Sequence, residues 1–181
     1  MTAAAQRRAA VAAILRPAES DTEVLLIRRA ERQGDPWSGH MAFPGGHHEP
    51  SDPDLRATAM RETLEEVGLD LRDHEYIGQL DELAATARGR LVGMTITPHV
   101  FVLQGATSPT LRPNYEVAEL VWGSIGKMFR GELDAIKELT YNGETRRLPA
   151  FQVSEHLVWG MTHNMLRSLF ALLSTEPAKV G

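Results

Sequence analysis

Apolar residues occur along the chain in short runs that polar segments separate. Residues 10–15 and 23–28 are two such runs, and each predicts a strand. The second is apolar on both faces, which indicates a central position in a sheet. Further strands are predicted for residues 40–43, 75–80, 91–103 and 116–123. Within the longest of these, Pro98 belongs at an edge or a bulge, because proline cannot donate a backbone hydrogen bond.

The segment from residue 54 to residue 67 predicts an amphipathic helix. Asp52 or Asp54 can cap its N-terminus, with Pro53 in the first turn. Gly68 suits the left-handed position that ends a helix. The side chains expected on its buried side are Leu55, Ala57, Ala59, Met60, Thr63 and Leu64.

The remaining segments predict loops, a hairpin and two more helices. Polar loops are expected at residues 29–39, 81–90 and 104–115. A short helix is predicted at 124–130, and residues 139–141 and 146–151 can pair around the turn dipeptide Asn142-Gly143. A closing helix runs to about residue 173, and its apolar side consists of Met165, Leu166, Leu169, Phe170 and Leu173.

Composition narrows the class of protein. At 181 residues with 43% hydrophobic content, the chain is expected to form one domain over residues 1–181. The net charge of −5 argues against a general nucleic-acid binder, and the absence of cysteine excludes disulfides and thiol catalysis. No apolar run approaches the ~18 residues of a membrane span. The run at residues 9–15 lacks a signal-peptide cleavage site, so a cytoplasmic location is expected.

Three carboxylates gather at the end of the predicted helix. Glu62, Glu65 and Glu66 are spaced i, i+3 and i+4, so they fall on one face. Like charges at this spacing destabilise a helix by roughly 0.2–0.5 kcal/mol, and the helix dipole adds about 0.3–1 kcal/mol for each acid. A bound divalent cation would reverse this balance, and oxygen ligands select Mg²⁺, Mn²⁺ or Ca²⁺ rather than Zn²⁺. The alternative is a solvated acidic helix end.

The residues around this cluster, at about 46–69, resemble the box of the Nudix hydrolases. That box reads Gly, five residues, Glu, seven residues, Arg-Glu, an apolar residue, any residue, Glu-Glu, any residue, Gly and an apolar residue. Asp52 stands in place of the first Glu, eight residues rather than seven separate it from Arg61, and Thr63 replaces the apolar residue. The positions that match are Gly46, Arg61, Glu62, Glu65, Glu66, Gly68 and Leu69.

The longer spacing and the acid Asp52 resemble the coenzyme A pyrophosphatase branch of that family. The branch also has an upstream pattern, which residues 25–26, 29–30 and 39–46 match. The segment between these matches is one residue longer, and Asp35 occupies the expected position of a second arginine, for which Arg32 can substitute. The string His-x-x-Trp-Gly-x-Thr, which begins at His156, is also similar to this branch.

The resemblance implies a fold and a metal site. The fold is of the α/β class, a Nudix-type α/β/α sandwich around a mixed β-sheet, and the cofactor is Mg²⁺ or Mn²⁺. One of the box acids, or a later acid, orients the attacking water. The metal ligands that the resemblance implies are Glu62, Glu65, Glu66 and the backbone carbonyl of Gly46.

Around these ligands the resemblance implies supporting and substrate-binding residues. Arg61 has a catalytic role in which it holds the loop and the carboxylates in place, with Asp52 as its partner. A later acid, Glu116 or Glu119, is a further candidate for the metal site, with a solvent-facing strand acid as the alternative. The residues expected to contact the substrate are Arg29, Arg32 and His47, for which solvent exposure is the alternative.

The sequence therefore predicts metal-dependent hydrolysis of a pyrophosphate bond in a nucleoside-diphosphate-linked small molecule. By resemblance to the branch, the expected substrate is coenzyme A or an acyl derivative, giving 3′,5′-ADP and 4′-phosphopantetheine or its acyl form. Two alternatives stay open: the same chemistry on ADP-ribose, a dinucleotide or a nucleoside triphosphate, and a non-catalytic module that binds a nucleotide. Family members are frequently dimers, so a homodimer is an option. Nucleic-acid and membrane partners are not expected.

Overall fold

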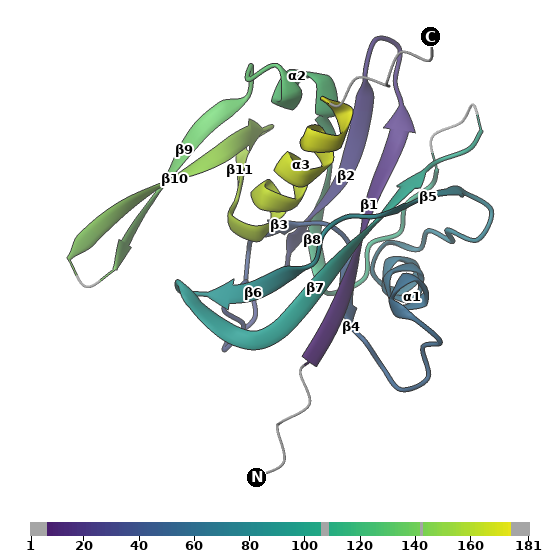
Figure 1. The fold of residues 1–181 in the computed structure, drawn as a ribbon, viewed down its shortest axis with the longest axis horizontal. Coiled ribbons are helices and arrows are strands. Elements are labelled where there is room, and N and C mark those ends of the chain that lie inside the picture. Colours follow the sequence, from purple (N-terminus) through teal and green to yellow (C-terminus); the bar gives the residue numbers. More distant parts are fainter. Residues whose placement is uncertain (1–6, 106–108, 142, 175–181) are drawn as a thin grey trace, which may run out of the picture.

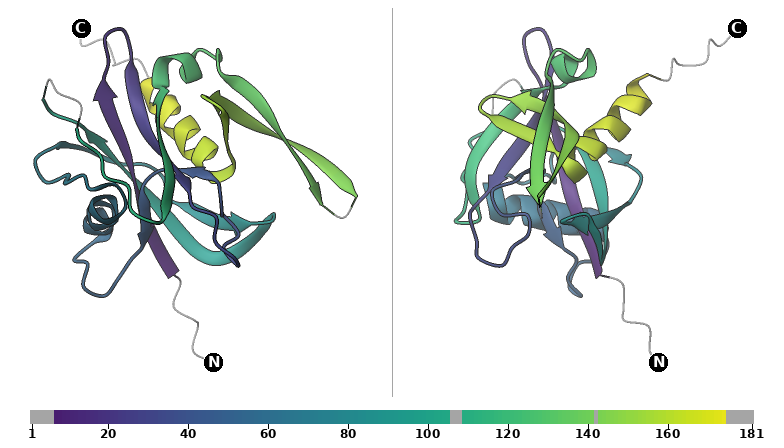
Figure 2. Two further views of the ribbon diagram at one scale, coloured as in Figure 1. Left: turned by 180° about the vertical axis from the view of Figure 1, so that it is seen from behind. Right: turned by 90° about the vertical axis from the view of Figure 1, so that its left-hand side faces the viewer.

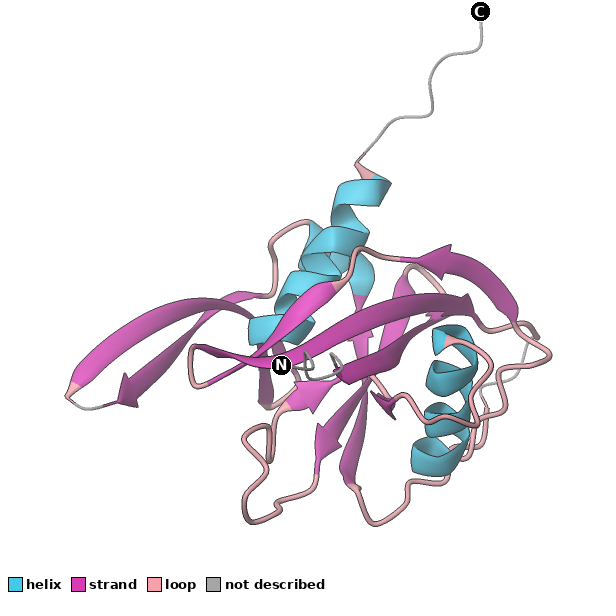
Figure 3. Ribbon diagram, turned by 60° about the horizontal axis from the view of Figure 1, so that its bottom comes forward, coloured by secondary structure: helices cyan, strands magenta, loops and turns pink. Residues whose placement is uncertain are grey.

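The computed structural model describes residues 7–105, 109–141 and 143–174. Within these residues the strands form an eight-stranded mixed sheet and a separate three-stranded antiparallel sheet. Helix α1 (Leu55–Val67) covers one face of the large sheet, and α3 (Gly160–Leu173) lies with the small sheet on the other face (Figure 1, Figure 3). This arrangement confirms the expected α/β/α sandwich around a mixed sheet.

The large sheet consists of β1 (Arg7–Pro17), β2 (Thr22–Arg29), β3 (Met41–Ala42), β4 (Gly45–His47), β5 (Glu75–Gln79), β6 (Leu83–Ala87), β7 (Arg90–Val102) and β8 (Val117–Ser124). The small sheet consists of β9 (Asp134–Tyr141), β10 (Glu144–Val153) and β11 (His156–Trp159). A short helix, α2 (Ile125–Phe129), connects the two sheets. It lies where residues 124–130 predict it.

Strand β1 is the centre of the large sheet. Its residues 7–15 pair in parallel with residues 94–102 of β7. On its other edge, β1 pairs antiparallel with β2 at its C-terminal end and with β4 at its N-terminal end. Because β4 contains Gly45 and Gly46, this second pairing places the glycine pair beside both β1 and α1.

Each face of the large sheet has its own hydrophobic core. Leu25 and Ile27 of β2 belong to the core under α1, whereas Val24 and Leu26 belong to the core under α3. Side chains along a strand alternate between the two faces, so both sets are buried. The run of consecutive apolar residues in β2 thus reflects a strand covered on both sides, as the sequence predicts.

Two details in the middle of the chain differ from expectation. Residues 81–90 are not a loop throughout, because they include β6, which pairs antiparallel with β7. Pro98 lies at neither an edge nor a bulge but inside β7, where the strand passes from its pairing with β6 to its pairing with β5. The Pro98 carbonyl accepts a hydrogen bond from Leu80 N at 2.9 Å. The N–H that proline lacks therefore falls in the gap between the two partner strands.

The structure shows which of the two predicted residues caps the N-terminus of α1. Asp54 is the N-cap, and its side chain accepts a hydrogen bond from Ala57 N at 2.7 Å. Pro53 therefore precedes the helix instead of forming its first turn. Asp52 is not the cap and has a different partner.

The C-terminal ends of the helices follow the predictions except at two leucines. Gly68 has a φ of +70° and its N–H donates to Leu64 O at 3.0 Å, so it ends α1 as expected. Leu64 itself is exposed, whereas the neighbouring Thr63 is buried. Leu173 is also exposed, because the last turn of α3 extends past the sheets (Figure 2). In the parts of the chain that are described, no helix is long and apolar enough to cross a membrane.

The predicted hairpin is longer than expected. Residues 134–141 of β9 pair with residues 144–151 of β10, and the two strands project away from the body of the molecule (Figure 2). Gly143 has a φ of +80°, which suits a turn. Asn142, the other half of the predicted turn dipeptide, lies outside the described residues.

Candidate active site

The last turns of α1 lie beside the glycine pair of β4. Glu66 accepts a hydrogen bond from Gly45 N at 2.8 Å. A Cβ atom at Gly46 would lie 2.5 Å from the carboxyl group of Glu62. At Gly45 the φ is +152°, and a Cβ would lie 2.3 Å from the carbonyl oxygen of Ala10. Glycine at position 45 is therefore needed to make room for strand β1, and glycine at position 46 leaves the space that the Glu62 carboxylate occupies.

The three carboxylates of the cluster differ in burial. Glu66 is buried, the Glu62 side chain is 18% exposed, and the Glu65 side chain is 54% exposed. Burial raises the pKa of Glu66 to about 7, against the hydrogen bond from Gly45 and with a further contribution from the charge of Glu62. Burial also raises the pKa of Glu62, against the effect of Arg61. Negative charge is thus gathered where solvation is poor, a condition that a bound cation would relieve.

Arg61 connects the cluster to the loop before α1. Its Nε and Nη2 atoms donate to the two carboxylate oxygens of Asp52 at 2.9 and 3.0 Å, and Nη2 also donates to His47 O at 3.0 Å. Its Nη1 atom donates to Glu62 at 3.1 Å and to Glu65 at 3.3 Å. The hydrogen bonds from Arg61 hold the pKa of Asp52 well below its usual range. The expected pair of Arg61 with Asp52 is present, and it ties the loop to the helix.

Of the two later acids, the structure brings Glu116 to the cluster. Its charge contributes to the raised pKa values of both Glu62 and Glu66. Glu119 instead forms an ion pair with Arg28 at 3.6 Å across β2 and β8. Alternation along β2 places Arg28 on the face that α3 covers. Glu119 is therefore directed away from the carboxylates of α1.

The three expected substrate contacts have different surroundings. Arg29 pairs with Asp35 at 2.6 Å, and its charge opposes the raised pKa of Glu66. Arg32 lies 3.8 Å from Glu116, with more than half of its side chain exposed. The His47 side chain is exposed, and its backbone carbonyl makes the contact with the site. The two arginines thus line the edge of the cluster, and Asp35 stands beside them in the place of the expected second arginine.

The model of the NUDIX domain family matches residues 6–142. The chain belongs to the Nudix family. An uncharacterised protein of Schizosaccharomyces pombe is 32% identical over 90% of this chain, which spans only 60% of that protein. A mouse protein named mitochondrial coenzyme A diphosphatase NUDT8 is 30% identical, and the match covers 89% of this chain and 77% of the mouse protein.

Solved Nudix structures share the architecture. The binary complex of a Caenorhabditis elegans Ap4A hydrolase has a TM-score of 0.61 at 17% identity, covering 92% of this chain and 97% of that one. A MutT/nudix family protein from Enterococcus faecalis has a TM-score of 0.64 at 17% identity, covering 96% of this chain and 64% of that one. At these identities the likeness supports the Nudix fold and nothing finer.

The donor set of this Nudix site suits a hard divalent cation. Its side-chain donors are carboxylates, and carboxylate and carbonyl oxygens are the ligands that Mg²⁺ and Mn²⁺ prefer. Among the described residues, no three His, Cys, Asp or Glu side chains already form a metal-binding group. Glu62 and Glu65 face Nη1 of Arg61 instead. Arg61 therefore holds these two carboxylates together through a single atom, Nη1.

Thr58 was not identified from the sequence as part of this candidate site, and His48 was identified only as a loop residue that could contact substrate. The Thr58 hydroxyl donates to Asp52 at 2.8 Å, and Nδ1 of His48 lies 2.9 Å from that hydroxyl. Thr58 precedes Arg61 by three residues, so helical spacing places both on one side of α1 and could have identified Thr58. The contact of His48 with Thr58 had no comparable signal, because His48 lies in a loop.

Proposed function

We propose that this protein hydrolyses a pyrophosphate bond in a nucleoside-diphosphate-linked small molecule and depends on Mg²⁺ or Mn²⁺. The observation that carries the proposal is the position of Glu62 and Glu66 against the glycine pair at residues 45–46. Poorly solvated carboxylates at a close approach of the backbone are costly unless a cation offsets their charge. Membership of the Nudix family supports hydrolysis as the reaction.

Each group of the site has a proposed role. When bound, the divalent cation neutralises charge on the pyrophosphate oxygens and lowers the pKa of a water molecule. A carboxylate of the site accepts the proton of the attacking water. The water oxygen bonds to one phosphorus, and the bridging oxygen leaves with the other phosphate. The residues proposed to hold the cation are Gly46, Glu62, Glu65, Glu66 and Glu116.

Arg29 and Arg32 are proposed to bind the phosphates of the substrate. The planar guanidinium group can donate two parallel hydrogen bonds to a phosphate. Arg32 has a long ion pair of 3.8 Å with Glu116, so little is lost when it turns toward a ligand. Arg61 is proposed to act through the carboxylates, since its donors are already directed to Asp52, Glu62 and Glu65.

The proposed substrate is coenzyme A or an acyl derivative, with 3′,5′-ADP and 4′-phosphopantetheine or its acyl form as products. Mouse and human relatives named mitochondrial coenzyme A diphosphatase, each 30% identical over 89% of this chain, support this choice. The one-residue-longer spacing from Asp52 to Arg61 supports it as well. Asp35, which pairs with Arg29, occupies the position where the branch has a second arginine, so the test also includes other substrates.

A substrate panel tests the proposal. Purified protein is incubated with Mg²⁺ and with coenzyme A, ADP-ribose, NADH or a nucleoside triphosphate, and phosphate is measured after coupling to a phosphatase. We expect coenzyme A to be cleaved fastest and EDTA to abolish the reaction. Turnover of ADP-ribose with coenzyme A inert would reject the substrate but retain the reaction. Binding of a nucleotide without turnover of any compound would indicate the non-catalytic module.

A further inference from the structure

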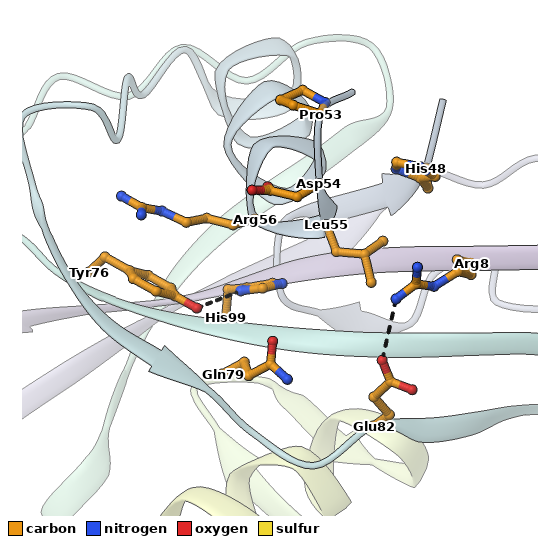
Figure 4. Close-up of a pocket in the computed structure, with 10 residues that line it drawn as sticks. All are labelled: Arg8, His48, Pro53, Asp54, Leu55, Arg56, Tyr76, Gln79, Glu82 and His99. Carbon is orange, nitrogen blue, oxygen red and sulfur yellow. Dashed lines mark hydrogen bonds and ion pairs between the residues drawn. The ribbon is translucent and has the colours of Figure 1, made fainter. Parts of the chain in front are cut away.

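A chain of hydrogen bonds extends from Arg61 away from the carboxylate cluster. Asp52, whose side chain is 5% exposed, accepts from Arg61 and also from the Thr58 hydroxyl at 2.8 Å. Thr58 is fully buried, and its hydroxyl lies 2.9 Å from Nδ1 of His48. This series of hydrogen bonds ends at His48, which lines a pocket of about 510 Å³ at the N-terminal end of α1 (Figure 4).

The hydroxyl of Thr58 has an unusual partner for a helical threonine. Such a hydroxyl ordinarily donates to the carbonyl four residues earlier, as Thr63 does to Ala59 O at 2.7 Å. Thr58 lies 3.2 Å from the corresponding carbonyl of Asp54, but 2.8 Å from Asp52. The shorter distance assigns its single proton to Asp52.

This assignment fixes the proton on the imidazole ring. A hydroxyl that donates its only proton to Asp52 can only accept from a third group. Nδ1 of His48 must therefore carry a hydrogen and donate to Thr58. The direction of donation then runs from His48 to Thr58 to Asp52. Oδ2 of Asp52 accepts from Thr58, from Glu49 N and from Nη2 of Arg61, and Oδ1 accepts from Nε of Arg61.

The position of Asp52 affects Glu62 and Glu65 through the planar guanidinium group of Arg61. With Nε and Nη2 of Arg61 held by Asp52, the direction of Nη1 is fixed as well. Nη1 is the atom that faces Glu62 and Glu65. If Asp52 could rotate, the guanidinium would turn with it and both carboxylates would lose their common partner.

The charges that line the pocket beside His48 do not select a ligand. The charged lining of the pocket consists of two arginines and two carboxylates, so its charge favours neither an anion nor a cation. These residues are Arg8, Arg56, Asp54 and Glu82 (Figure 4). Glu82 pairs with Arg8 at 3.7 Å, and Asp54 is occupied as the helix cap. The informative feature of this region is therefore the connection of His48 to Thr58.

We propose that Thr58 and His48 are positioning residues, which lock Asp52 and so direct Arg61 onto Glu62 and Glu65. Neither residue touches the proposed substrate or metal. The inference rests on the proposed function, because the orientation of these two carboxylates matters there for holding the cation. Residues that orient metal ligands from outside the coordination shell typically change metal affinity or activity by about 10–100-fold when replaced.

The test compares two buried threonines of the same helix. Thr58→Val removes the hydroxyl that binds Asp52, whereas Thr63→Val removes a hydroxyl that serves only the helix and supplies the apolar residue of the Nudix box. Thr58→Ser keeps the hydroxyl. His48→Ala removes the donor at a half-buried position without opening the core, and His48→Asn supplies an N–H donor close to where Nδ1 lies. Circular dichroism and thermal unfolding establish that each full-length variant is folded.

Two readouts are used, and the first needs neither metal nor substrate. The ¹⁵N chemical shifts of the His48 ring are expected to show the Nδ1–H tautomer in the wild type and in Thr63→Val, and to lose it in Thr58→Val. The second is the affinity for Mn²⁺, measured from the electron paramagnetic resonance signal of the free ion. We expect Thr58→Val and His48→Ala to weaken it about tenfold or more, with Thr58→Ser and His48→Asn close to wild type. On any substrate that is cleaved, kcat should fall with KM little changed.

The outcomes separate this inference from the proposed function. Equal Mn²⁺ affinity in Thr58→Val, His48→Ala and Thr63→Val overturns the positioning role. A selective loss of affinity in a protein that cleaves no pyrophosphate compound supports the positioning role and overturns the proposed hydrolysis. A wild type that does not bind Mn²⁺ overturns both.

Discussion

Asp52 is the residue on which the geometry before α1 depends. From the sequence it could serve as the helix cap or as the partner of Arg61, because two aspartates flank Pro53 and helix starts are uncertain by one or two residues. In the structure Asp54 takes the cap, and Asp52 accepts from Arg61 and Thr58. Spacing alone could not make this choice, since it depends on where the chain enters the helix.

The Asp52–Arg61 pair should contribute to stability in a pH-dependent way. Arg61 holds the pKa of Asp52 below its ordinary value of 3.8, so the ionised form is favoured in the folded state. The contribution is therefore complete above about pH 4 and is lost as the pH falls further. We expect Asp52→Asn to lower the free energy of unfolding at pH 7 by about 3 kcal/mol, because Arg61 loses its buried partner.

Urea unfolding of the wild type and Asp52→Asn at several pH values measures this effect. The difference between the two proteins should shrink as the pH is lowered from 4 toward 2. Asp81→Asn, at an exposed position between β5 and β6, is the control and should have little effect at any of these pH values. A difference that stays constant down to the lowest pH would contradict the assignment.

At the scale of elements, α1 was predictable and β4 was not. The helix has local signals at both ends and a regular apolar side. The predicted bounds, residues 54 and 67, lie within one residue of the observed helix, Leu55–Val67. Strand β4 consists of Gly45, Gly46 and His47, which have low intrinsic preference for a strand, and it exists because it pairs with β1. The same reason explains why β6, in an alanine-rich stretch, was expected to be a loop.

The two glycines of β4 should respond differently to alanine. At Gly45 the added Cβ meets the backbone of β1 and the φ of +152° is unfavourable, so Gly45→Ala should destabilise the fold by roughly 1–3 kcal/mol. At Gly46 the added Cβ meets only the end of the Glu62 side chain, which can turn away. Gly46→Ala should therefore cost little stability and weaken Mn²⁺ binding. Urea unfolding and calorimetric Mn²⁺ titration measure both effects, and the opposite order would refute this account of β4.

At the scale of the whole molecule, the site is assembled from distant parts of the chain. The box acids come from α1, Arg29 comes from β2, and Glu116 precedes β8. The Nudix box could be identified from the spacing of its residues in the sequence, and the resemblance to the family predicted the fold. The choice between Glu116 and Glu119 could not be made from the sequence, because it depends on which face of the large sheet each acid occupies.

The most direct test of the central claim compares Glu66→Gln with Glu155→Gln. Gln is nearly the same size as Glu and can still accept the hydrogen bond from Gly45, but it removes a buried negative charge beside the proposed cation. Glu155 is an exposed acid in the turn between β10 and β11. The measurement is the initial rate of Mg²⁺-dependent hydrolysis on the best compound of the panel. We expect Glu66→Gln to lower turnover by about a hundredfold or more with the fold intact, and Glu155→Gln to match the wild type. A Glu66→Gln variant that turns over at the wild-type rate would contradict the claim.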